Sequence, residues 1–449
     1  MSIVNNAEIE IKKNNIINTE DIKLRHFLNN TKENGMFYLG HASIIAVFNG
    51  KKILFDPIVL SKPYADSWSF YPPQILDQIL FEVDAVIVSH IHQDHYDVHF
   101  LKEINKKIPI TIIGNRDSFE SNLRINGIKN INIVQPDKIT EIFKNIFIYG
   151  LVHEYNGIDS SCIVFNNKFS LYHGNDNYIE PTTMKKFINI TPKIDVACIP
   201  YAYIHWYPFL LEYDNRKEKE FECERMPKIQ MNWGINATKI LNPNIMIPFG
   251  ANLLLDDGNG YSTMNLAVKT PFEFYDYAIQ ECPDLISVIK PMLAGDYCIS
   301  NGDKLECTIH NSLKSNKYRE IIDNHLKKLP VKIIDKKFNL NEKNNFIATL
   351  NDRLKSINNY FHNHCIRIDI DCLNLKQKLE INCSTYIASW VEDYNQNVEF
   401  HHFVLDPFST NLWLSGGRFE EVLGTRRFKV IRKPNIYNKE ILYIINNIL

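Results

Sequence analysis

The residues best suited to chemistry lie in one short run, Ser89-His90-Ile91-His92-Gln93-Asp94-His95. Three imidazoles and one carboxylate fall within six residues, in the spacing His-x-His-x-Asp-His. Imidazole nitrogen and carboxylate oxygen are usual protein ligands of zinc and of non-haem iron. A helix could not aim all four side chains at one point, because residues two apart do not share a face. The run therefore predicts a metal site on a loop.

The elements around this run predict a scaffold rich in short strands. Residues 83–88 form an apolar run that suits a buried strand and ends just before His90. Upstream, Asn49-Gly50 joins two strand-like runs and is typical of a type I′ hairpin turn. Many short strands interleaved with helices favour an α/β sandwich of two sheets flanked by helices. We predict strands at 37–39, 44–48, 53–55, 83–88, 110–113, 131–134, 146–152, 162–165, 169–172, 196–199 and 245–248, and helices at 97–106, 182–188 and 231–241.

Composition narrows the class of protein. The chain has 449 residues, of which 45% are hydrophobic and 23% are charged, as in a globular protein of two or three domains. A net charge of -2 gives no basic surplus for nucleic acid, and no apolar run is long enough to span a membrane. No apolar stretch follows Lys12 and Lys13, so we expect neither a signal peptide nor an anchor. Nine scattered cysteines without a Cys-x-x-Cys pair favour reduced thiols in a cytoplasm. We expect a cytoplasmic protein with a small-molecule substrate and no nucleic-acid or membrane partner, and homo-oligomerisation stays open.

The chain divides into three regions. Polar sequence precedes residue 35, and Asn301-Gly302-Asp303 is a turn that opens a lysine-rich stretch. New strand-like runs follow at 365–371 and 400–405. We therefore predict an N-terminal extension at 1–34, a metal-binding domain at 35–300 and a C-terminal α+β region at 301–449, for substrate binding or dimerisation. The C-terminal arginines could bind an anion, although a solvated charged face is the commoner role; they are Arg418, Arg426, Arg427 and Arg432.

In its strand context the histidine-rich motif resembles the metallo-β-lactamase superfamily, over about residues 36–260. The resemblance implies an αβ/βα sandwich with the site at the edge between its two sheets. It implies that His90 and His92 hold a first metal and that Asp94 and His95 serve a second. The implied cofactor is one or two divalent metal ions, with zinc as the first expectation and iron as the alternative.

The resemblance also implies ligands further along the chain. A later histidine should follow a strand, and His153 does so, 58 residues after His95. A bridging aspartate should follow the next hairpin, where Asp176 stands. Because Asn175 interrupts the usual Gly-Asp pair, His173 competes for this place. We favour Asp176, since a carboxylate can bridge two cations and a neutral imidazole cannot easily do so.

The family's last ligand has no direct counterpart in this chain. It is a histidine after a late strand, and the matching strand at 245–248 is followed by no histidine. The second metal therefore uses Asn252 or Asp257, is held weakly, or is absent. His205 is a further candidate among aromatic residues, where a role in the core or in a pocket wall is the commoner one.

Two further segments match the family. Gly40-His41-Ala42-Ser43 resembles the subgroup with phospholipase D-like and lactonase-like members. Asp56 would be a carboxylate that orients a ligand histidine. A simple turn at the end of a strand explains Asp56 almost as well.

The order of several short motifs is similar to that of one branch of the family. The order of Asp56-Pro57, the histidine motif, Cys162-Ile163-Val164 and Pro248-Phe249-Gly250 resembles the CMP-N-acetylneuraminate hydroxylase group. That group carries a Rieske cluster, held by a Cys-x-His and a Cys-x-x-His pair. This chain has only the second kind of pair, Cys307-Thr308-Ile309-His310, so we expect no such cluster. An oxygenase would then need a separate reductase.

The sequence supports three functional hypotheses. The first is a metal-dependent hydrolase that uses metal-activated water on a phosphodiester, ester or lactone. In it, Asp94 or Asp176 passes the proton, and His205 or Tyr207 stabilises the developing oxyanion. The second is a non-haem di-iron oxygenase of a small or sugar-nucleotide substrate. The third is a non-catalytic binding protein with a degraded metal site.

Overall fold

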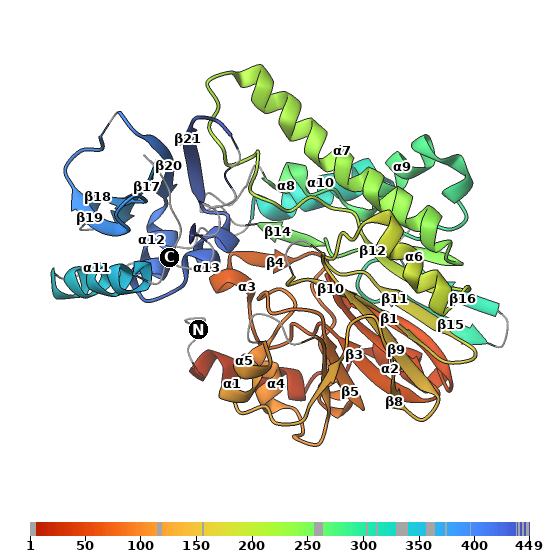
Figure 1. The fold of residues 1–449 in the computed structure, drawn as a ribbon. Coiled ribbons are helices and arrows are strands. Elements are labelled where there is room, and N and C mark those ends of the chain that lie inside the picture. The colour runs from red at the N-terminus through yellow and green to blue at the C-terminus, as the bar shows by residue number, and fades with distance from the viewer. Residues whose placement is uncertain are drawn as a thin grey trace.

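The computed structural model shows a large α/β sandwich with a smaller sheet-and-helix unit, formed by the C-terminal part of the chain, beside it (Figure 1). No described helix is long and apolar enough to cross a membrane. The structure describes residues 6–114, 119–154, 157–255, 264–301, 304–310, 313–328, 340–355, 364–372, 375–395, 397–436, 438, 441, 444–445 and 449.

The first sheet has eight strands within the described ranges. Their order is β16 (Lys304–Thr308), β15 (Tyr297–Asn301), β1 (Asn34–Gly40), β2 (Ser43–Phe48), β3 (Lys51–Phe55), β5 (Ala85–Val88), β6 (Ile110–Ile113) and β7 (Ile131–Val134). Strands β1 to β3 form an antiparallel meander, and Asn49 and Gly50 have φ angles of 47° and 78°, both positive as a type I′ turn requires. Strands β3, β5, β6 and β7 are parallel, so their carboxyl ends share one edge of the sheet.

The second sheet packs face to face against the first. Its order is β13 (Ile245–Phe249), β12 (Val196–Pro200), β11 (Ser170–His173), β10 (Ser160–Phe165), β9 (Ile146–Val152) and β8 (Ile139–Phe143). Side chains alternate along each strand, so Met36 and Tyr38 enter the layer between the sheets while Phe37 and Leu39 face the helices. Because both faces are covered, β1 is buried along its whole length.

Helices cover the outer face of each sheet, which completes the predicted αβ/βα sandwich (Figure 1). On the first sheet lie α1 (Asn6–Ile17), α2 (Ile22–Asn30), α4 (Val98–Glu103) and α5 (Phe119–Ile125), and on the second α6 (Pro181–Ile190), α7 (Arg216–Leu241) and α9 (Pro271–Glu281). The remaining short elements of the sandwich are α3 (Pro63–Asp66), β4 (Trp68–Phe70), η1 (Gln78–Glu82), β14 (Leu253–Leu255), α8 (Met264–Ala267) and η2 (Pro283–Leu285).

The C-terminal unit is a five-stranded sheet with its own apolar core. It follows α10 (Ser315–Leu326) and α11 (Leu340–Leu354) and has the strand order β19 (Ile387–Val391), β18 (Leu375–Asn382), β17 (His364–Cys372), β20 (Glu399–Leu405) and β21 (Phe428–Lys433), with α12 (Pro407–Leu414) and α13 (Phe419–Thr425). It joins the sandwich through a β-bridge between Leu211 and Val430 and a hydrogen bond from Trp68 Nε1 to Gly424 O, 2.7 Å long. The region boundary that we predict near residue 300 falls at the β15–β16 hairpin of the first sheet.

Two local expectations differ from the structure. The helix predicted at 231–241 is the last part of α7, which begins at Arg216 and contains Pro227. A proline inside a helix removes a backbone donor, so the sequence pattern did not predict that the helix continues through Pro227.

Cys298 and Cys307 form a disulfide, which corrects the expectation of reduced thiols for this pair. The two cysteines stand directly opposite each other on β15 and β16, a pairing that cysteine spacing did not reveal.

Candidate metal centre

The histidine-rich run folds into a tight loop at the carboxyl end of β5. Ser89 directly follows β5, and its amide and hydroxyl donate to the Asp56 carboxylate at 2.8 and 2.7 Å. Asp56 directly follows the neighbouring parallel strand β3, so strand pairing brings it to this point. Beyond Ser89, the backbone amides of His95 and Tyr96 both donate to the carbonyl of His92. This turn gathers the side chains of the run at the edge between the two sheets.

Three groups of side chains in the described residues could each hold a metal ion. They are His90, His92 and Asp159; His90, His95 and Asp176; and His41, Asp94 and His95, and the ligand atoms of each group lie within 4.8 Å of one another. The groups share His90 and His95, so they form one continuous centre.

The distances within the centre fit shared ions better than hydrogen bonds. His90 Nε2 lies 3.6 Å from Asp159 Oδ1, and His95 Nε2 lies 3.4 Å from Asp94 Oδ2 and 3.5 Å from Asp176 Oδ2. Two ligands about 2.1 Å from one ion are separated by roughly 3 to 3.5 Å. His95 Nε2 is fully buried yet makes no hydrogen bond of ordinary length in the described part of the chain. The donor set therefore fits divalent metal ions.

The charged side chains of the centre shift one another's pKa values. Burial opposes the charged form of His95, but the carboxylates of Asp94 and Asp176 outweigh it and raise the pKa of this imidazole well above its usual value. Burial would likewise raise the pKa of Asp94, yet His95 and His41 hold it well below its usual range. Asp56 accepts a hydrogen bond from His95 Nδ1 at 2.8 Å, which leaves Nε2 directed at the centre. Without metal, protons on the imidazoles balance the carboxylates.

The structure brings five of the six predicted metal ligands into these groups and leaves one outside. His90, His92, Asp94, His95 and Asp176 are members. His153 belongs to none of them, whereas Asp159 belongs to the group with His90 and His92. The amide of His153 donates to the carbonyl of Asp159 at 2.8 Å across the end of the β9–β10 hairpin. The two residues are therefore neighbours, and the Asp159 carboxylate is the one that joins the centre. A carboxylate directly before a buried strand was the only sequence signal for it.

The other candidates occupy different surroundings. His173 donates from Nε2 to the carbonyl of Ala42 and belongs to no ligand group, unlike its competitor Asp176. His205 also belongs to none; the residue is exposed, and its ring stacks on that of Trp206 with the ring centroids 5.2 Å apart. Asn252 donates to the hydroxyl of Tyr38, and Asp257 lies outside the described residues.

The C-terminal unit borders the centre through α13. Glu420 Oε1 lies 3.6 Å from His92 Nε2, and the side chain of Gln93 donates to Glu421 at 3.0 Å. Loss of hydration lowers the pKa of His92, but the contact with Glu420 and the nearby carboxylates raise it to about 9. On the facing segment, the hydroxyl of Tyr64 donates to Asp94 Oδ1 at 3.1 Å. The C-terminal unit is thus part of the wall of the site.

The C-terminal arginines do not share a single partner. Arg418 pairs with Glu420 and Arg427 with Asp406, whereas Arg426 donates to the backbone carbonyls of Leu423 and Ile204. Arg426 thereby ties α13 to the loop after β12, beside the metal centre.

Comparison with known proteins agrees with this geometry. Residues 36–208 match the family model described as a beta-lactamase superfamily domain. The chain is 29% identical over 115 residues to the UPF0173 protein YddR of Bacillus subtilis, which covers 22% of this chain and 43% of the relative. It is 27% identical over 138 residues to the cytidine monophosphate-N-acetylneuraminic acid hydroxylase of Cricetulus griseus, which covers 29% of this chain and 24% of the relative. The chain thus spans less than half the length of these curated relatives.

The solved structures that match part of this chain include two metalloproteins. Igni18, a metallo hydrolase from Ignicoccus hospitalis, has 16% sequence identity and a TM-score of 0.41, over 62% of this chain and 99% of that one. CmlA, a diiron beta-hydroxylase from Streptomyces venezuelae, has 15% identity and a TM-score of 0.42, over 62% of this chain and 54% of that one. The part of the chain that matches the beta-lactamase superfamily domain, residues 36–208, is thus also the part that carries the histidine motif at the edge of the αβ/βα sandwich.

Proposed function

We propose that the chain is a metal-dependent hydrolase that uses metal-activated water on a phosphodiester, ester or lactone. The observation that carries the proposal is the position of Asp176. Its Oδ2 lies 4.0 Å from His90 Nε2 and 3.5 Å from His95 Nε2, between the ligands expected for two ions. A carboxylate in this position suits a two-metal site, an arrangement common in enzymes that hydrolyse phosphate esters.

The residues around the centre have separate roles in this proposal. When bound, the metals would supply Lewis acidity and lower the pKa of a coordinated water. Asp176 is one-third exposed, so it can accept a proton from that water and release it to solvent. Burial and the nearby Asp94 carboxylate raise the pKa of the Tyr64 phenol well above its usual value. Tyr64 therefore stays protonated. Its single hydroxyl hydrogen, which Asp94 accepts in this structure, could turn to a developing oxyanion once Asp94 holds a metal, which is the role that we predicted for His205 or Tyr207.

A second candidate, a non-haem di-iron oxygenase, is favoured by Asp159. With Asp159 beside His90 and His92, the first ligand set becomes two histidines and one carboxylate. That set is typical of non-haem iron oxygenases, although it also holds zinc in some peptidases. The named hydroxylase relative points the same way. This candidate requires iron and a separate reductase.

Metal content tests both candidates. Protein purified without oxygen or chelator is analysed by mass spectrometry beside His92→Ala, with the exposed His26→Ala as a control for loss of an imidazole. Zinc that is lost only in His92→Ala, with turnover of phosphodiesters or lactones, supports the hydrolase. Iron lost in the same way, with oxygen uptake, moves the oxygenase to first place. A wild-type chain that binds neither metal refutes both and leaves the non-catalytic binding protein.

We also propose that the protein acts in the cytoplasm on a small molecule, without nucleic-acid or membrane partners. The net charge of -2 supports the exclusion of nucleic acid, because it offers no basic surplus. Fractionation of the source cells and a nucleic-acid binding assay test the two parts separately.

A further inference from the structure

The family pattern leaves one position of the second metal site without a ligand in this chain. The late strand β13 is followed by Gly250-Ala251-Asn252, where a histidine is expected. We propose that His41, from the turn between β1 and β2, takes the place of this missing histidine as a ligand of the second metal. The inference rests on the metal centre of the proposed function.

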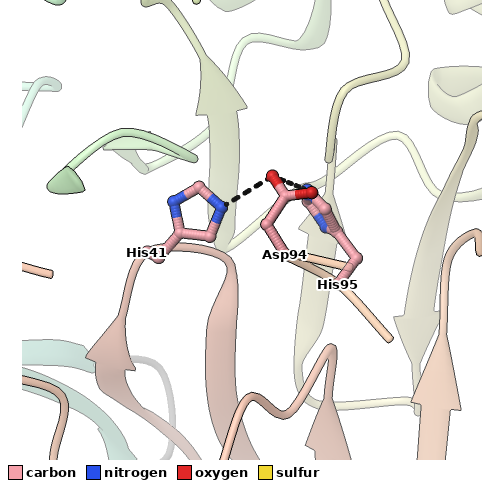
Figure 2. Close-up of side chains that lie close together, drawn as sticks. All are labelled: His41, Asp94 and His95. Atoms are coloured by element: carbon pink, nitrogen blue, oxygen red, sulfur yellow. Dashed lines mark hydrogen bonds and ion pairs between the residues drawn. The ribbon is translucent and has the colours of Figure 1, made fainter. Parts of the chain in front are cut away.

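The position of the imidazole supports this assignment. His41 Nε2 lies 3.3 Å from Asp94 Oδ2, and His95 Nε2 lies 3.4 Å from the same oxygen. Figure 2 shows the two rings on either side of the Asp94 carboxylate, with both contacts converging on one oxygen. The three side chains are buried and come from two separate segments of the chain. Two nitrogens and a carboxylate oxygen thus surround one point.

The other ring nitrogen determines which atom can bind a metal. His41 Nδ1 lies 2.8 Å from the carbonyl oxygen of Ala251. A carbonyl can only accept, so Nδ1 carries the hydrogen, and Nε2 of the neutral ring presents its lone pair to Asp94. A lone pair that faces a carboxylate needs a cation between them, either a proton or a metal ion. Ala251 lies in the segment that lacks the expected histidine, so that segment orients the replacement ligand through its backbone.

The backbone of His41 is held in an unfavourable conformation. Its φ is 51°, in the left-handed region that a non-glycine residue enters at a cost of about 1–2 kcal/mol. The pairing of β1 with β2 shifts register between Tyr38 and Gly40, just before this residue. Tyr38 donates to the carbonyl of His41 at 2.8 Å and accepts from Asn252 at 3.0 Å, which stabilises the turn. Strain that is maintained by such contacts is common where a side chain must be aimed at a functional site.

The test compares metal binding by His41→Asn with that of the wild type. The Asn amide nitrogen can replace Nδ1 as the donor to Ala251, and asparagine tolerates a positive φ, so the variant removes Nε2 and little else. The matched control is His173→Asn, which alters another buried histidine, one that belongs to no ligand group.

Equilibrium dialysis against Zn²⁺ measures the number and affinity of the ions, and Co²⁺ substitution gives an absorption spectrum that reports the ligands. We expect two ions in the wild type and in His173→Asn. In His41→Asn we expect one ion to remain and the other to bind at least about tenfold more weakly, with a changed cobalt spectrum. Thermal unfolding of the metal-free proteins shows whether each variant is folded, and His41→Ala provides a second variant if His41→Asn is not.

Unchanged stoichiometry, affinity and cobalt spectrum in a folded His41 variant would overturn the assignment, and the proposed function would survive if His92→Ala still loses metal. A wild-type chain that binds no metal would overturn both. A loss of stability without any change in metal binding would assign His41 a purely structural role and would also overturn the proposal.

Discussion

The buried carboxylate of Asp56 provides the sharpest test of how this centre is organised. Asp56 is fully buried and accepts hydrogen bonds from the amide of Ser89, the hydroxyl of Ser89 and Nδ1 of His95. It directs Nε2 of His95 at the centre, although Asp56 belongs to no ligand group itself. We predict that Asp56→Asn weakens metal binding without removing a ligand.

The magnitude follows from the hydrogen-bond geometry. If the new amide nitrogen faces His95, Nδ1 must accept, and the hydrogen moves to Nε2, where it blocks the metal. If the amide nitrogen faces the amide of Ser89 instead, two buried donors oppose each other, at a cost of about 1–3 kcal/mol. Loss of a group that orients a ligand histidine typically reduces metal affinity by about 10 to 100-fold, or roughly 1.4–2.7 kcal/mol. We expect Asp56→Asn to fall in this range.

Competition with a chromophoric chelator measures the affinity, and chemical denaturation of the metal-free protein measures the fold. Asp77→Asn is the matched control, because Asp77 is equally buried, accepts hydrogen bonds from Asp21 and Arg25, and lies in no ligand group. The control should lose stability and keep its metal affinity. Wild-type affinity in Asp56→Asn, or an equal loss of affinity in Asp77→Asn, would refute the reasoning.

Three further predictions follow from other residues of the centre and its wall. Asp159→Ala should lose the first metal while His153→Ala keeps it, as measured by metal content; loss in His153→Ala alone would restore the assignment made from sequence. The pKa of His92 is raised to about 9, so protonation of this imidazole stabilises the folded, metal-free protein. This stabilisation is fully present below pH 6.5 and is lost as the pH rises through about 9. Metal must displace this proton, so metal affinity should rise over the same window; calorimetry in buffers of different ionisation enthalpy measures the release, and its absence would contradict the assigned charge state. A Cβ at Gly424 would lie 1.9 Å from Cδ1 of Tyr64. Gly424→Ala should therefore destabilise the protein by about 1–3 kcal/mol and displace the Tyr64 ring from the site. An unchanged melting temperature would contradict this close packing of Gly424 against Tyr64.

The sequence by itself predicts the part of the site that lies within one short segment of the chain. The spacing of His90, His92, Asp94 and His95 lies within one loop, and the apolar run before it predicts the buried strand that ends there. Hairpin signals such as Asn49-Gly50 depend only on the conformations that these residues adopt. Such features can be predicted because neighbours along the chain determine them.

The rest of the centre depends on contacts between distant segments. His41, Asp159 and Glu420 come from three separate elements, and the spacing along the chain does not show that they lie beside the histidine-rich loop. The backbones of His153 and Asp159 are hydrogen-bonded at the end of the β9–β10 hairpin, and only the Asp159 carboxylate belongs to a ligand group. Local spacing therefore predicted the loop that carries the candidate metal centre, whereas the pairing of distant strands and the docking of α13 decided which other side chains lie beside it. The physical reason is that a ligand's direction depends on the register and packing of its whole element, and these are set by the tertiary fold.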